Sequence, residues 1–210
     1  MLRHAFWSGI ASGMLVGIGG TVYLSCDNKV VGAVLFSVAL LVICILGLYL
    51  YTGKIGLFIE NPNKKSALAL AVGLAGNAVG AALTGVLVAI AKPSLIDVAA
   101  RACASKLDGG MLKGLIAAIF CGVLMYAAVK TYLAGGTLVG IVFCIPTFIL
   151  CGFEHSVADV YYFTVASFGG FDPMSILFVL VAVVGNTLGG WLLPLLMRLG
   201  KGKDKQNESK

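Results

Sequence analysis

The sequence has few charged residues and no stretch that resembles a soluble domain. Only 11% of its 210 residues are charged and 60% are hydrophobic, whereas globular domains are about 25% charged. This composition predicts an integral membrane protein with about six helices, at roughly 20 residues per span. The net charge of +6 is explained by basic residues that flank apolar segments, so it gives no reason to expect a nucleic-acid partner.

Motifs for metal binding and catalysis are also scarce. The six cysteines form no C-x-x-C pair and four of them lie in apolar runs, so we expect buried hydrophobic side chains rather than metal ligands or disulfides. The H-E-x-x-H motif of zinc enzymes and the paired N-P-A motifs of aquaporin-type pores for neutral solutes are both absent. A membrane enzyme with Glu154 and His155 as an acid–base pair is an alternative, but the sequence offers it no second catalytic cluster.

A glutamate and a histidine interrupt one of the most apolar regions. Glu154 and His155 follow Gly152, with a helix length or more of apolar sequence on either side. Ionisable side chains in a membrane span are costly and usually face a bundle interior or a water-filled cavity. A break in a helix is tolerated there only where the backbone is buried in protein or lines a cavity. We therefore predict a functional site here; an ordinary loop outside the lipid is the alternative.

Six apolar segments predict six transmembrane helices in an all-α fold, with the second and fifth interrupted. The segments are residues 3–25, 30–59, 66–91, 112–129, 137–168 and 174–199. We expect the interruptions at Leu48–Lys54 and Cys151–Ser156. For the first, a belt of interfacial tyrosines at a helix end is the alternative. Asp97–Leu107 is expected to form a short helix between spans.

A short motif occurs once in each half of the chain. Gly76–Gly80 and Gly185–Gly189 share the pattern G-N-x-x-G, and each ends a three-helix unit with an interrupted middle helix. Because each unit has an odd number of spans, the two copies must be inverted; a chance match is the alternative. Inverted repeats with paired broken helices indicate a transport site near the middle of the membrane.

The expected domain boundaries follow from this repeat. Residues 1–200 form a six-helix channel domain with halves at about 1–92 and 110–200, and residues 201–210 form a charged cytoplasmic tail. The charged sequence from Arg198 onward is expected to be disordered. Nine lysines and arginines lie on the side of the amino terminus and five on the other side, which predicts that both termini are cytoplasmic.

Two segments resemble a known family. Cys151–Ala158, with the sequence C-G-F-E-H-S-V-A, resembles the signature of the formate/nitrite transporter family, and Gly185–Gly190 is similar to its sixth-helix motif. The resemblance extends over the whole chain in order and spacing. It implies a homopentamer of aquaporin-like protomers in the inner (plasma) membrane, without a cofactor. Each protomer would have its own pore for formate, nitrite, hydrosulfide, acetate or lactate.

The resemblance also implies roles for individual residues. His155 matches the central pore histidine, with Thr52 within reach of it and Asn186 as its sixth-helix partner. Lys106 matches a lysine that attracts the anion near the outer vestibule. The alternatives are that Asn186, like Asn77, only cross-links helices, and that Lys106 is a solvated loop charge.

The expected hydrophobic constrictions consist of Phe36, Leu40 and Phe148 in one case and Leu50 in the other; exposure of Phe36 and Phe148 to lipid is the alternative. The remaining residues of the signature loop are Gly152, Phe153, Glu154 and Ser156.

The chain departs from the family pattern at two places. Asp159 occupies a position that is usually Asn, where a carboxylate would either alter selectivity or only cap a helix. Leu48–Thr52 replaces a more common Asp-Leu-Phe-Thr pattern. Glu154 is expected to bond backbone groups at the break, because a fixed negative charge would repel an anion.

The physical chemistry of a weak acid predicts protonation during passage. A bare anion crosses an apolar ring at high cost, whereas the neutral acid passes easily. His155 is the only histidine in the interior of the predicted membrane region, and imidazole titrates nearest to physiological pH. We expect the anion to gain a proton near His155. Proton donation by the imidazole and hydrogen bonding alone are both compatible with the sequence.

Overall fold

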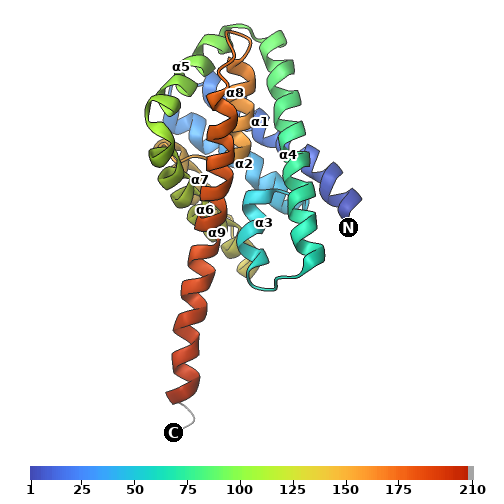
Figure 1. Cartoon of the computed structure of the whole chain (residues 1–210), viewed down its shortest axis with the longest axis vertical. Helices are drawn as coiled ribbons and strands as arrows, with labels where there is room; N and C mark the ends of the chain where they lie inside the picture. Colours follow the sequence, from blue (N-terminus) through green and yellow to red (C-terminus); the bar gives the residue numbers. More distant parts are fainter. Residues whose placement is uncertain (208–210) are drawn as a thin grey trace.

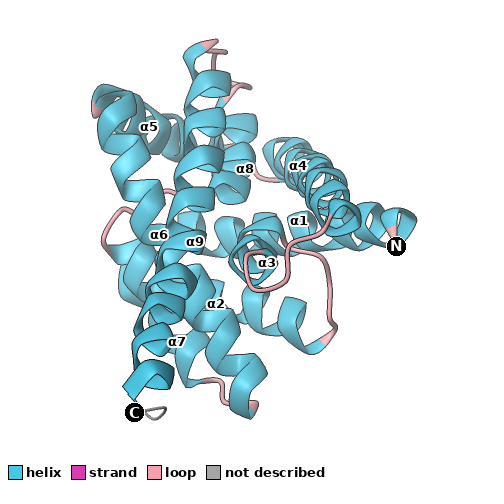
Figure 2. Ribbon diagram, turned by 60° about the horizontal axis from the view of Figure 1, so that its bottom comes forward, coloured by secondary structure: helices cyan, strands magenta, loops and turns pink. Residues whose placement is uncertain are grey.

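The computed structural model describes residues 1–207, which form nine α-helices and no strand (Figures 1 and 2). The helices are α1 (Leu2–Ser25), α2 (Lys29–Ile45), α3 (Tyr51–Phe58), α4 (Lys64–Ala91), α5 (Ser94–Asp108), α6 (Gly110–Gly135), α7 (Val139–Leu150), α8 (Ser156–Ala166) and α9 (Met174–Asn207). Four of them, α1, α4, α6 and α9, are long and apolar enough to cross a membrane, and α2 and α7 are shorter apolar helices. The prediction of an all-helical membrane protein is confirmed.

The two segments predicted to be interrupted are each divided into two helices. α2 and α3 are separated by residues 46–50, and α7 and α8 by residues 151–155. The first break was predicted at Leu48–Lys54, but α3 already begins at Tyr51. Tyr51 is buried and its hydroxyl lies 2.7 Å from that of Thr187, so it does not belong to an interfacial belt.

Both breaks begin with the same turn. α2 and α7 are each followed by a glycine in the left-handed conformation, Gly47 at φ 64° and Gly152 at φ 67°. One residue later, the N–H of Leu48 donates to the carbonyl of Ile43, and Phe153 donates likewise to Phe148, both at 2.9 Å. This is the Schellman arrangement, which ends a helix and satisfies its last carbonyl groups.

Small residues allow the long helices to pack closely in two pairs, α1 with α4 and α6 with α9. A Cβ atom added at Gly13 would collide with the backbone of Asn77, and one added at Gly122 with the backbone of Asn186. Such contact between backbones is typical of packed membrane helices, and it explains much of the high glycine content.

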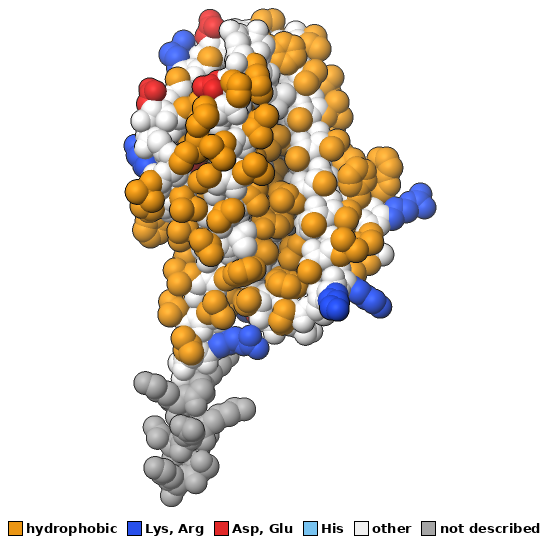
Figure 3. Space-filling model, viewed as in Figure 1, with side chains coloured by type: hydrophobic (Ala, Val, Ile, Leu, Met, Phe, Trp, Pro, Cys, Tyr) orange, Lys and Arg blue, Asp and Glu red, His pale blue; other side chains and the backbone are white. Residues whose placement is uncertain are grey.

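The exterior is apolar over the middle of the molecule. Figure 3 shows hydrophobic side chains over most of the visible face, with the charged side chains toward its margins. Leu87, Phe143 and Leu180 are examples of large apolar side chains that are exposed. A large exposed apolar surface marks a region that contacts lipid or other protein.

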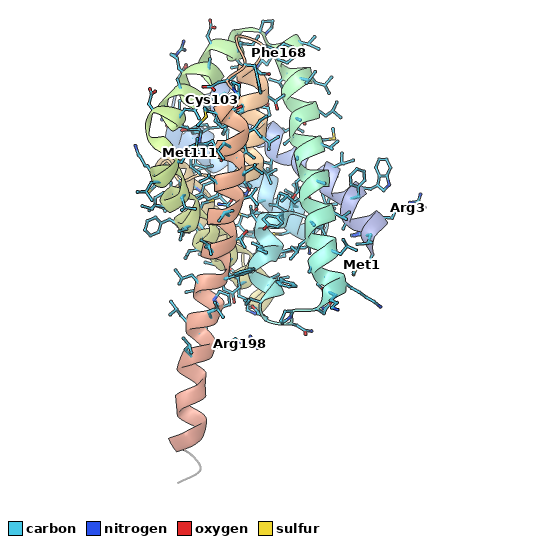
Figure 4. All side chains as sticks on the ribbon, in the orientation of Figure 1. Met1, Arg3, Cys103, Met111, Phe168 and Arg198 are labelled. Carbon is cyan, nitrogen blue, oxygen red and sulfur yellow. The ribbon has the colours of Figure 1, made fainter. Side chains whose placement is uncertain are left out.

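The carboxyl-terminal part of α9 extends beyond the other helices (Figure 1). Phe168 and Arg198 lie toward opposite ends (Figure 4), and the guanidinium of Arg198 donates to the carbonyl of Ile59 at 3.1 Å. The prediction of disorder from Arg198 onward is wrong up to Asn207, because α9 continues to that residue (Figure 1). Residues 208–210 of the predicted tail lie outside the described residues. The predicted short helix at Asp97–Leu107 is confirmed as part of α5.

Candidate functional site

Two cavities lie beside the two helix breaks. The His155 cavity has a volume of about 390 Å³ and is lined mainly by α5, α6, α8 and the second break, with smaller contributions from α1, α2 and α7. The Lys54 cavity has a volume of about 90 Å³ and is lined by α2, α3, α6 and the first break. Each cavity combines apolar side chains with at least one lysine, which is a suitable lining for a small anion that must lose water.

His155 immediately precedes α8, and both nitrogens of its buried ring have hydrogen-bond partners. Nδ1 lies 3.2 Å from the backbone nitrogen of Ala158, and Nε2 lies 2.8 Å from Oγ1 of Thr52. Because a backbone N–H can only donate, Nδ1 accepts this bond and the proton of the neutral ring is on Nε2. Nε2 then donates to the Thr52 hydroxyl.

This tautomer limits the chemistry of the imidazole. The one free lone pair of the neutral ring caps the first turn of α8, so protonation there would break the cap. The ring is also stacked on Phe148, with centroids 5.7 Å apart and planes at 12°. Neutral His155 can therefore offer an N–H to a small anion, but it has no free site for an additional proton.

Thr52 brings the two breaks together. It lies in the first turn of α3, is fully buried, and reaches His155 at the start of α8. Leu50 and Gly53, which flank Thr52, line the Lys54 cavity, whereas His155 lines the other cavity. The expected proximity of Thr52 and His155 is thus present, and their hydrogen bond connects a lining residue of the His155 cavity to the chain neighbour of Gly53, which lines the Lys54 cavity.

Asn186 lines neither cavity. Its Oδ1 accepts from the N–H of Ser156 at 2.9 Å, and its Nδ2 donates to the carbonyls of Ala118 at 2.9 Å and Glu154 at 2.8 Å. The amide is thereby occupied by backbone groups. The structure supports the cross-linking role that the sequence left open rather than the role of a pore partner.

Asn77 makes the corresponding bonds at the first break. Its Oδ1 accepts from the N–H of Tyr51 at 2.8 Å, and its Nδ2 donates to the carbonyls of Gly9 at 2.9 Å and Tyr49 at 2.8 Å. The asparagines of the two G-N-x-x-G motifs therefore have the same structural role: each bonds the start of a short helix to a long helix.

Lys106 lies in the His155 cavity between two carboxylates. Its Nζ forms a close ion pair with Glu154 and lies 3.1 Å from Oδ1 of Asp159. Burial by itself lowers the pKa of Lys106, but the charges of Asp159 and Glu154 raise it above the ordinary value, so the ammonium stays charged. Lys106 is therefore neither a solvated loop charge nor a free cation.

The structure overturns the expectation for Glu154 and one of the two alternatives for Asp159. The side chain of Glu154 was predicted to bond backbone groups, but it pairs with Lys106, and only its backbone carbonyl accepts the bond from Asn186. Asp159 was expected either to change selectivity or to cap a helix. It accepts no backbone bond in the described chain, so it does not cap a helix; it lines the cavity, and an effect on selectivity stays a prediction.

The residues expected in hydrophobic constrictions are all buried, so Phe36 and Phe148 do not face lipid. The structure assigns these four residues to two cavities in a different grouping from the two predicted constrictions. Phe36 and Phe148 line the His155 cavity, whereas Leu40 lies with Leu50 in the Lys54 cavity. In the signature loop, the ring of Phe153 stacks on Phe120 with centroids 5.2 Å apart.

One site residue was missed. Lys54 lines the second cavity, and its Nζ lies 5.2 Å from the centre of the Tyr49 ring. The sequence contained a signal for it, because Lys54 is the only charged residue between Lys29 and Glu60. A lone lysine in an apolar run points to a buried role.

The comparison with protein families is decisive on identity. The profile described as formate/nitrite transporter matches residues 1–199. The chain belongs to the formate/nitrite transporter family. This transporter family member is accordingly a membrane transport protein for small anions and not an enzyme, which removes the alternative of a membrane acid–base catalyst.

Solved structures agree on the fold. A pentameric formate channel with formate bound is 19% identical to the transporter, with a TM-score of 0.79 over 94% of this chain and 96% of that one. An FNT family ion channel is 22% identical, with a TM-score of 0.73 over 91% and 86%. No curated protein matched the sequence.

Proposed function

We propose that the protein conducts small monovalent weak-acid anions across the inner (plasma) membrane, with formate or nitrite as the first candidates. Hydrosulfide, acetate and lactate are alternatives of the same chemical class. The observation that carries this proposal is the hydrogen bond between His155 and Thr52, which lies between two lysine-containing cavities, one lined by His155 and the other by Gly53 beside Thr52. It supports the proposal because the N–H of His155 would be a donor for a partly dehydrated anion between two largely apolar cavities.

The proposed topology has six spans in two inverted units, residues 1–92 and 110–200. The first unit contains α1, α2 with α3, and α4, and the second contains α6, α7 with α8, and α9. The matching bonds of Asn77 and Asn186 and the matching turns at Gly47 and Gly152 support the repeat. The excess of lysine and arginine on the side of the two termini supports their cytoplasmic location.

The proposed assembly is a homopentamer in which each protomer has its own pore. Two observations support it: the similar formate channel is pentameric, and much of the apolar surface of the protomer is exposed. In a bilayer this surface would be shared between lipid and neighbouring protomers.

In the proposed mechanism, lysines attract the anion and apolar side chains exclude its water. Lys54 supplies a cation to one cavity, and Lys113, which forms no ion pair within the described residues, supplies one to the other. The apolar lining consists of Phe36, Phe148, Leu40 and Leu50. The N–H at Nε2 of His155 binds the anion in exchange for Thr52. The anion then crosses as the neutral acid, because an ionised species pays a much larger desolvation cost.

The test is anion flux into proteoliposomes of purified protein, at an outside pH of about 5.5 and about 7.5, on either side of the ordinary histidine value. We expect formate, nitrite, hydrosulfide and acetate to enter faster at the lower pH and chloride to be excluded. His155→Phe, which removes the N–H donor, should assemble normally and lose most of this uptake. Equal, pH-independent passage of chloride and the weak acids would contradict the proposal, as would normal uptake by the folded variant.

A further inference from the structure

The carboxyl group of Asp159, in the His155 cavity, is better placed than the imidazole of His155 to bind and release a proton. Asp159 lies in the first turn of α8, is 1% exposed and lines the cavity. Its Oδ1 is 3.1 Å from Nζ of Lys106, whereas its buried Oδ2 has no hydrogen-bond partner in the part of the chain that the structure describes. A buried carboxylate oxygen without a partner carries a large desolvation cost.

The charges around Asp159 do not balance if every group is ionised. Lys106 supplies one positive charge to two carboxylates, those of Glu154 and Asp159. Lys113 also lines the cavity but forms no ion pair within the described residues. Two carboxylates that share one site rarely both stay ionised, because like charges repel strongly in a poorly solvated environment. One proton bound between them would neutralise the cluster and remove the repulsion of an entering anion.

The geometry favours Asp159 over Glu154 as the carrier of this proton. Glu154 makes the closer contact with Lys106, and Asp159 is the more buried carboxyl group. The amino-terminal end of α8 favours an ionised Asp159, but the N–H groups of Ser156 and Ala158 in its first turn are already bonded.

The other titratable groups that face Asp159 do not compete with it for this proton. They are Cys103 of α5, Cys121 of α6, Tyr162 of α8 and His155 at the break. The thiols and the phenol are protonated near neutral pH, and the neutral imidazole uses its lone pair to cap α8.

We propose that the carboxyl group of Asp159 is the proton donor to the anion in the His155 cavity. The Oδ2–H bond breaks and an O–H bond forms on the anion, or an S–H bond in the case of hydrosulfide. The Asp159 carboxylate left behind is stabilised by Lys106, and it regains its proton from water of the solution that the cavity faces. This inference rests on the proposed function and specifies the source of its proton.

The first test is the pH dependence of formate uptake by Asp159→Asn, which keeps the shape of the side chain but cannot donate an acidic proton. We expect uptake at an outside pH of about 7.5 to fall at least about tenfold, in line with the loss of a general acid. The remaining uptake should follow the concentration of undissociated formic acid. Asp159→Glu, which retains a carboxyl group, should recover part of the loss.

Cys103→Ala is the matched control. It alters a buried neighbour of Asp159 that does not line the His155 cavity, and it should keep the wild-type rate and pH profile. A wild-type pH profile for Asp159→Asn would overturn the inference while leaving the proposed function intact. Absence of weak-acid uptake by the wild-type protein would instead overturn the proposed function.

The second test does not depend on transport. Infrared spectra of the wild-type protein near neutral pH should contain the C=O stretch of a protonated, buried carboxyl group. This band should disappear in Asp159→Asn. Absence of the band from the wild-type spectrum, or its persistence in a folded Asp159→Asn, would overturn the inference.

Discussion

Asn77 and Asn186 hold the two helix breaks in the same way, each with one accepted and two donated hydrogen bonds. The accepted bond comes from the N–H at the start of a short helix. The donated bonds go to a carbonyl just before that helix and to a carbonyl of a long helix. Backbone groups left unpaired by a helix break have no water to bond inside a membrane. Each buried amide forms hydrogen bonds with three backbone groups, and it thereby stabilises the break.

Replacement of Asn186 by Ala should therefore destabilise the fold. It leaves one N–H and two carbonyls unpaired in a buried site, and we expect a loss of about 2 kcal/mol or more in the free energy of unfolding. The measurement is the thermal unfolding midpoint of the purified protein in detergent. Asn63→Ala is the control, because Asn63 caps α4 and donates to the carbonyl of Asn61 from an exposed position, so it should lower the midpoint less. An Asn186→Ala protein that unfolds at the wild-type temperature would refute this role.

The sequence was sufficient to locate both breaks but not the partners of their polar residues. Glycine next to ionisable residues in an apolar run is a local signal, and it marked the region of Gly152 correctly. The role of Asn186 depends on which backbone groups lie opposite it after folding. A polar side chain in an apolar helix looks the same in the sequence whether it faces a pore or another backbone.

The position of Leu40 shows a similar limit. Phe36 and Leu40 are four residues apart on α2 and share one face, which is why the sequence placed them together. Four residues also correspond to a rise of about 6 Å along the helix. That rise is enough to place Phe36 beside the His155 cavity and Leu40 beside the Lys54 cavity.

The cluster of Lys106, Glu154 and Asp159 could not be predicted from spacing. Its members come from α5, the second break and α8, and they meet only because α5 packs on α8. The sequence marked each residue as notable by itself, but the neutralisation of Lys106 by two carboxylates is a property of the tertiary structure.

Replacement of Gly152 by Ala tests the turn that starts the second break. No atom lies within 4 Å of the place where the new Cβ would sit, but φ is +67°. A residue with a side chain pays about 1–2 kcal/mol in this conformation, so the unfolding midpoint should fall. Gly135→Ala also meets no atom and has no positive φ, and it should leave the midpoint unchanged or raise it. Equal midpoints for the two variants would argue against strain at Gly152.

Thr52→Val tests the partner of the imidazole, because valine has nearly the same shape but cannot accept a hydrogen bond. The Nε2–H of His155 would be left buried and unpaired, at a cost of about 1–3 kcal/mol, and the ring would lose the contact that orients it. We expect formate uptake to fall by about tenfold at every pH, since the proposed proton donor is unaffected. Thr52→Ser, which retains the hydroxyl, should transport almost normally. Wild-type uptake by the valine variant would show that the bond does not position His155.

Glu60 should make stability depend on pH at one end of the molecule. Its carboxylate accepts bonds from Lys130 at 2.7 and 2.9 Å and from the hydroxyl of Tyr126 at 2.8 Å. Burial raises the pKa of Glu60, but these bonds and the charge of Lys130 outweigh it, so the pKa lies below its ordinary value. A lowered pKa in the folded state adds stability at neutral pH, and this stability is lost as the pH falls through the folded-state value.

Glu60→Gln should accordingly lower the unfolding midpoint at a pH of about 7, and its difference from the wild type should shrink as the pH falls through the folded-state value. The effect should be small and should shrink in high salt, because the side chains of Glu60 and Lys130 are 35% and 37% exposed and solvent screens such pairs. Lys130→Met should lower the midpoint in the wild-type background but not in Glu60→Gln, since its partner is then uncharged. A difference between Glu60→Gln and wild type that persists unchanged at low pH would show that packing, and not the ion pair, is what Glu60 contributes.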